Sequence, residues 1–187
     1  MREVLGIRLN RDGPARVIKV LGATIVRDTG DAAGATRTWC YIIRNPFGSA
    51  SVDFGSNLEM AGPEFEADDI RVTRVGPYHP PDAKCAAARL DGAVTTVAGL
   101  RLGLDRKQVL HLLGEPTARA GDSLWFAWMS KRQLSHADPQ YAYWNARRDE
   151  CFEGKAPYAN VDGTITVRID STGVYQFELS RDANAVC

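Results

Sequence analysis

Residues 99–116, GLRLGLDRKQVLHLLGEP, decide how this chain is expected to fold. Asp105 is a good helix N-cap, because a short carboxylate accepts hydrogen bonds from the free amides of the first helical turn. Apolar residues then recur at helical spacing, at Val109, Leu110, Leu112 and Leu113. Gly114 supplies a C-terminal stop and Pro116 prevents continuation. The stretch therefore predicts a short amphipathic helix.

Residues 6–22, GIRLNRDGPARVIKVLG, repeat this pattern near the N-terminus. Asp12 stands before the expected helix, Pro14 lies near its first position, and Gly22 lies at its end. Further along the chain, Trp39 aligns with Trp125. These ordered matches indicate that the chain is an internal duplication.

Alternation of β-branched and aromatic residues predicts three strands in each copy. The predicted strands are residues 36–44, 49–54 and 70–75, and residues 123–129, 164–169 and 174–179. We therefore expect an α+β fold of two tandem repeats, each a short helical layer packed on a small antiparallel β-sheet. The first helix-on-sheet repeat would cover residues 1–80. The second would cover residues 81–187 and contain an insertion at 130–163.

The motif G-[IL]-R-L, a polar turn, V-x-x-x-L-G-x-P and a tryptophan strand resembles two related groups of bacterial envelope proteins. Its best match covers Gly99 to Trp128. It is similar to the small outer-membrane assembly lipoproteins of the SmpA/OmlA type. The duplicated form is similar to the tandem-repeat β-lactamase inhibitory proteins (BLIP-like). The resemblance implies a non-enzymatic envelope protein that works by binding another protein, without naming that partner.

The insertion at 130–163 is longer than an ordinary hairpin loop. It contains Tyr141, Tyr143, Trp144 and Arg147. Tyr, Trp and Arg dominate interface energetics, because each offers a large contact area together with a polar group. We expect a protein-binding surface centred on these four residues. The alternative is that the three aromatic residues form an extra strand and complete the core.

The strand at 123–129 adds Trp125 and Trp128 to the expected binding surface. Their positions have opposite parity, so a sheet covered by helices on one side must point one of the two outward. Exposed aromatic side chains that cluster on a sheet mark a binding surface. If a second layer or a dimer covers that face, these side chains are core instead.

The first copy expands a different connection, Gly55 to Asp69. It contains five acidic residues, Glu59, Glu64, Glu66, Asp68 and Asp69. Such a loop could enter a basic cleft on a partner, or it could be a solvated surface.

Four cysteines occur at wide spacing and without a C-x-x-C motif, which argues against a metal site. We expect two disulfides, Cys40 with Cys85 and Cys151 with Cys187. In each pair one cysteine lies in or after the first strand of its copy, and the other follows the last strand. Two further connectivities, and four buried free thiols, are the alternatives.

Charge and hydropathy restrict the possible partners and location. The chain has 23 basic and 23 acidic side chains, so it lacks the basic excess that nucleic-acid binding requires. No apolar run is long enough for a transmembrane segment, and the first ten residues are too charged for a secretory signal. With disulfides, the expected location is periplasmic or secreted, with a signal removed. A cytoplasmic location is the alternative.

The sequence contains no motif that indicates an enzyme or a cofactor site. His136, Asp138 and Cys151 could in principle form a nucleophile and base set, which makes a cysteine-dependent hydrolase a distant alternative. The expected function is protein binding in the bacterial envelope, as an inhibitor, neutraliser or assembly factor. A cytosolic immunity protein that masks a cognate toxin is the second possibility.

Overall fold

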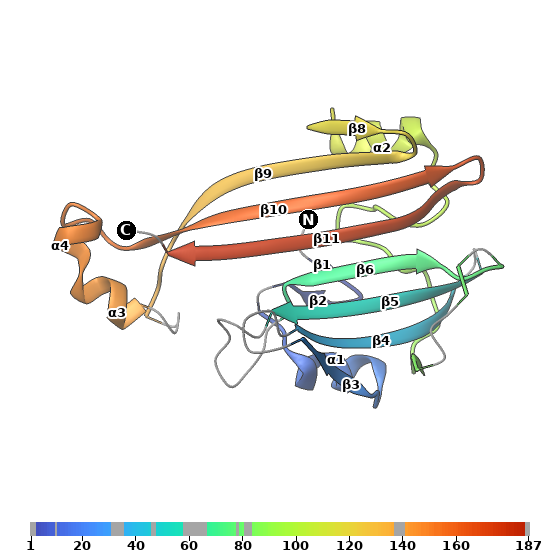
Figure 1. The fold of residues 1–187 in the computed structure, drawn as a ribbon, viewed down its shortest axis with the longest axis horizontal. Coiled ribbons are helices and arrows are strands. Elements are labelled where there is room, and N and C mark those ends of the chain that lie inside the picture. Colours follow the sequence, from blue (N-terminus) through green and yellow to red (C-terminus); the bar gives the residue numbers. More distant parts are fainter. Residues whose placement is uncertain are drawn as a thin grey trace.

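One antiparallel sheet dominates the protein (Figure 1). The computed structural model describes residues 3–9, 11–30, 36–45, 48–57, 67–77, 79–80, 84–136 and 141–185. Within them the elements are β1 (Glu3–Val4), β2 (Ile7–Arg8), α1 (Pro14–Leu21), β3 (Val26–Thr29), β4 (Thr36–Asn45), β5 (Gly48–Asn57), β6 (Asp69–Arg74), β7 (Ala86–Ala87), α2 (Arg106–Leu113), β8 (Ala118–Ala120), β9 (Ser123–Gln133), α3 (Tyr141–Ala146), α4 (Arg148–Cys151), β10 (Tyr158–Asp170) and β11 (Gly173–Ala185).

Helix α2 begins and ends where its sequence predicts. The Asp105 carboxylate accepts a hydrogen bond from the amide of Gln108 at 2.8 Å, and the Gln108 side chain accepts one from the amide of Asp105 at 2.9 Å. This reciprocal pair is a capping box, which satisfies two amides that the helix itself leaves unpaired. Gly114 ends the helix with a φ of +81°, which favours glycine.

Helix α1 also has its predicted extent, but a different N-cap. Pro14 occupies the first turn, whereas the N-cap is Gly13 rather than Asp12. The Asp12 carboxylate instead accepts a hydrogen bond from the amide of Arg8 at 2.8 Å. Asp12 therefore closes the turn that precedes the helix.

The strand order in the main sheet is β3-β4-β5-β6-β11-β10-β9-β8, with β7 pairing in parallel with β4. Strands β6 and β11 pair over five residues, from Asp69 with Ser180 to Thr73 with Gln176. They join the strands of both halves of the chain into one sheet of nine described strands. Figure 1 shows α1 beside β3 and β4, α2 beside β8 and β9, and α3 and α4 at the far end of β9 and β10.

This architecture contradicts the expected α+β fold of two tandem helix-on-sheet repeats. The protein is mostly β, and α1 and α2 are only eight residues long, so they do not form a helical layer comparable with the sheet. Trp39 and Trp125, which the duplication aligned, also lie on opposite faces of the sheet. The first is fully buried and the second is 36% exposed. The division at residue 80 remains a prediction.

Successive side chains along each strand alternate between a core face and a second face, which we call the polar face. The core face supplies large buried side chains, among them Trp39, Tyr41, Phe54, Leu124, Phe177 and Leu179. Residues outside the sheet, including Val17 of α1, Val109 of α2 and Leu100, belong to the same core cluster. The sheet is therefore stabilised mainly from its core face.

Pairing registers define one row of residues across the polar face: Cys40, Asp53, Arg71, Glu178, Thr166 and Trp125. Charged groups occupy its centre, and Trp125 lies at its end near β8. The polar face thus offers a charged middle and an aromatic edge.

Candidate protein-binding surface

The connection between β9 and β10 forms two short helices rather than the predicted loop or core strand. It runs from residue 134 to 157, because β9 and β10 extend further than expected. None of the residues of α3 is buried. The alternative that Tyr141, Tyr143 and Trp144 complete the core as a strand is therefore wrong.

Tyr143 and Arg147 form an exposed pair on this connection. Tyr143 is 54% exposed. The Arg147 guanidinium lies 3.9 Å from the centre of the Tyr143 ring, and it donates a hydrogen bond to the Tyr143 carbonyl at 3.5 Å. A cation over an aromatic ring is attracted by the ring's negative face. The pair therefore presents one defined aromatic and cationic surface.

A chain of ring contacts anchors this surface to the sheet. Trp144 contacts Tyr143 edge-on, with ring centres 4.9 Å apart, and also contacts Phe152. Phe152 is buried and contacts Tyr158, the first residue of β10, at 5.2 Å. Trp144 is half-buried and lies between Tyr143 and Phe152, so it connects the exposed ring to the buried one. Tyr141 is half-buried as well, with its ring 4.3 Å from that of His136.

Trp125 and Trp128 do not join this cluster. Trp128 is half-buried on the core face, where its ring occupies the space beside Gly163 and packs against the core. Trp125 is on the polar face near the start of β9, and β9 leads to α3 from its other end (Figure 1). The eight residue-to-residue steps from 125 to 133 span about 26 Å in a strand. The predicted six-residue surface is therefore divided into separate parts.

The centre of the polar face is a charged cluster that the sequence did not reveal. Arg71 and Glu178 form an ion pair at 2.8 Å. Asp69 lies nearby against the backbone of Gly55, where a side chain would collide with its carboxylate. Burial, together with the charges of Asp68 and Glu178, raises the pKa of Asp69 to about 6. Of the predicted acidic loop, Glu59, Glu64 and Glu66 lie outside the described residues.

Asp69 is expected to make the protein less stable as the pH rises from about 4 to about 6. Its carboxyl titrates near 3.8 when unfolded and near 6 when folded, so the folded state holds the proton more tightly. The stabilisation is present below pH 4 and is lost as the pH rises through 6. Two pKa units correspond to about 3 kcal/mol, an upper limit for a group that water partly reaches.

The change Asp69→Asn should remove this dependence and raise the free energy of unfolding at pH 7. Chemical denaturation of the wild type and the variant between pH 4 and 8 measures the effect. If the free energies of unfolding of the two proteins change with pH in parallel, the pKa of Asp69 is not raised by folding. Ser51→Ala, on the same face but without a carboxyl, is the control.

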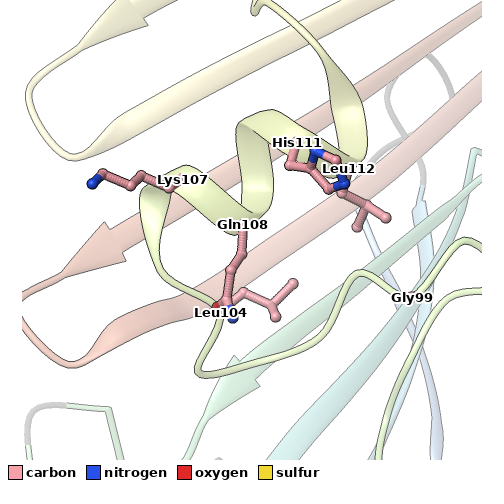
Figure 2. A pocket seen from close by; sticks show the side chains of 6 residues that line it. All are labelled: Gly99, Leu104, Lys107, Gln108, His111 and Leu112. Atoms are coloured by element: carbon pink, nitrogen blue, oxygen red, sulfur yellow. The ribbon is translucent and has the colours of Figure 1, made fainter.

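A shallow hollow of about 350 Å³ lies beside α2. Figure 2 shows Leu104 and Gln108 close together, whereas Lys107 points away from the other side chains. Gln108 is already occupied by the capping box with Asp105. The hollow is open and nearly apolar.

The predicted disulfide between Cys40 and Cys85 is confirmed, with Cα atoms 4.8 Å apart. Its sulfurs lie near Asp53, but bonded sulfurs are not thiolate ligands for a metal. Cys151 is also disulfide-bonded. Its expected partner, Cys187, lies outside the described residues.

The hydrolase alternative loses its nucleophile, because a disulfide-bonded Cys151 has no thiolate. Asp138, the expected third member, lies outside the described residues. The ring of His79 is stacked on that of Tyr175, with ring centres 4.9 Å apart. Tyr175 is the extra residue of a β-bulge, and its hydroxyl donates to the Asp122 carboxylate at 2.7 Å. A bulge redirects a side chain in a way that strand alternation does not predict.

Comparison with known proteins gives no match to a family profile, a curated protein or a solved structure. No helix within the described residues is long and apolar enough to cross a membrane.

The disulfide is typical of proteins from oxidising compartments.

Proposed function

We propose that this protein is a non-enzymatic binding module that recognises another protein through its α3–α4 segment. The pair of Tyr143 and Arg147 is the observation that carries the proposal. Residues of these types contribute most at interfaces when a partner excludes water from them. Their mutual contact restricts both side chains before binding, so association costs less conformational entropy.

The disulfide supports a site of action in the bacterial envelope, periplasmic or secreted, because cytosolic thiols are kept reduced. There the protein would inhibit, neutralise or help to assemble its partner, as the sequence resemblance implies. The same disulfide argues against the second possibility, a cytosolic immunity protein. Neither role requires a cofactor.

Replacing Tyr143 and Arg147 with Ala is expected to weaken partner binding by about 30-fold or more. A central anchor typically contributes about 2 kcal/mol or more on truncation, and 1.4 kcal/mol is a tenfold change in affinity. Folding should change little, because neither side chain is buried. The measurement is the dissociation constant with a partner isolated from native cells on the immobilised protein and then purified.

Lys107→Ala is a suitable control, since Lys107 is an exposed cation on α2, in a different part of the chain. It should leave the dissociation constant unchanged. Wild-type affinity in the double variant, or a large loss of thermal stability, would reject the assignment of Tyr143 and Arg147 as anchors.

A further inference from the structure

The outer edge of β9 presents backbone groups that have no partner among the described residues. Strand β8 pairs only with Ser123–Trp125, and the amide of Ala127 donates to the Thr117 hydroxyl at 3.0 Å. In an antiparallel pair, the amide and the carbonyl of one residue point to the same side of the strand. Because Ala127 bonds on the side of β8, the backbone groups of the odd-numbered residues of β9 point away from β10. Met129, Lys131 and Gln133 continue this parity beyond β8. Figure 1 shows β8 bordering only one end of β9.

We infer that the edge from Met129 to Gln133 takes up an extended, acidic segment of a protein partner as a further strand of the sheet. Within the described part of the chain, the three amides and three carbonyls of Met129, Lys131 and Gln133 have no partner, and an added strand satisfies such groups. The added strand would lie in line with β8 and lead toward α3. The inference rests on the proposed function, because it assumes a protein partner, and it specifies how that partner is held.

The charge of this edge defines the chemistry of the added strand. Its two ionisable side chains are Lys131 and Arg132, which are exposed cations on opposite faces of the strand. The Lys131 ammonium lies 4.4 Å from the centre of the Tyr158 ring and donates a hydrogen bond to its hydroxyl at 3.4 Å, so it remains at the surface beside the edge. Opposite charges in directly paired strand positions stabilise a sheet. Carboxylates of the added strand therefore belong opposite Lys131. An apolar side chain belongs opposite Met129, which is 75% exposed beside Ala127 on the polar face.

A second copy of the chain fits this edge less well. Antiparallel pairing of two such edges about Lys131 would place that cation directly opposite its own counterpart. Like charges in such positions are destabilising. Lysine on an open edge also limits pairing with arbitrary strands. The edge thus favours an acidic segment over the same edge of a second copy and over a neutral strand.

The binding test uses three synthetic octapeptides with blocked ends. The first repeats two valines followed by two glutamates, so that positions two apart on one face carry one apolar and one acidic side chain. The second has the same sequence with every amide N-methylated, and the third has lysine in place of glutamate. The first should slow hydrogen exchange at the amides of Met129, Lys131 and Gln133. The other two should bind at least tenfold more weakly. Equal binding of the N-methylated peptide, or unchanged exchange at these amides, overturns the inference.

Variants of Lys131 test the backbone and the charge separately. Lys131→Pro removes an outward amide together with the cation, so it is compared with Lys131→Gln, which removes the cation alone. The bonds between β9 and β10 come from even-numbered residues and are kept. Lys131→Pro should reduce binding of the glutamate peptide at least tenfold relative to Lys131→Gln. Lys131→Glu keeps the amide and should reverse the preference toward the lysine peptide. That reversal tests the inference even if the proline variant does not fold, and its absence rejects the acidic partner.

The native partner separates this inference from the proposed function. If Tyr143→Ala with Arg147→Ala abolishes partner binding but Lys131→Pro does not, the strand addition is wrong and the proposed function stands. If both variants lose binding, both are supported. Light scattering adds a further check: a wild-type dimer that Lys131→Glu converts to monomer would identify a second copy as the occupant and overturn the inference.

Discussion

Replacing Cys40 and Cys85 with Ala is expected to lower the free energy of unfolding by about 4 kcal/mol. The disulfide links residues separated by 45 positions, and closing a loop of this size restricts the unfolded chain by that amount in the chain-entropy estimate. It also fastens the segment that contains β7 onto β4, where Cys40 is buried. Guanidinium denaturation under non-reducing conditions measures the loss.

Mild reduction of the wild type provides the matched control. Reduction also opens the disulfide of Cys151, so the reduced wild type should match the stability of the reduced double variant. A variant within about 0.5 kcal/mol of the wild type would show that the native contacts around β4 and β7, not the cross-link, fix this region.

The sequence predicted the local elements well because their signals are local. Caps and stop residues placed α1 and α2 correctly, although Gly13 rather than Asp12 caps the first. Alternating residues located all six predicted strands, but the strands of the second half are longer, reaching 13 residues in β10 and β11. Strand ends depend on the neighbouring strand, which the sequence of one segment does not contain.

The fold class was wrong because it depends on a pairing between distant segments. Strands β6 and β11 lie far apart in the chain, yet their pairing merges the expected separate sheets into one. Hydrophobic alternation states which side of a strand is buried, but not which strand lies beside it. The same limit applies to the charged row on the polar face, because Arg71 and Glu178 meet only across that pairing.

The candidate site was predicted in part. Sequence reasoning identified the insertion with Tyr143 and Arg147, because an unusual density of aromatic and cationic residues is visible without a structure. It could not determine that Trp125 lies at the other end of β9, since it ended that strand four residues too early. The open edge at Lys131 was missed for the same reason. Two successive cations at the end of a strand, Lys131 and Arg132, were the feature of the sequence that could have indicated an open edge.

Trp39 and Trp125 are expected to respond very differently to replacement by Ala. Trp39 is fully buried and stacked on Phe54 at 6.0 Å between ring centres, so its removal leaves a cavity and should cost about 3–5 kcal/mol. Trp125 is 36% exposed on the polar face and should cost less than about 1 kcal/mol. Denaturation of both variants under identical conditions measures the difference. Similar losses would mean that the two residues occupy equivalent places, as the duplication first suggested. A large difference would show that the aligned tryptophans lie on opposite faces of the sheet. A displacement of one residue along a strand is enough to move a side chain from the core to the surface.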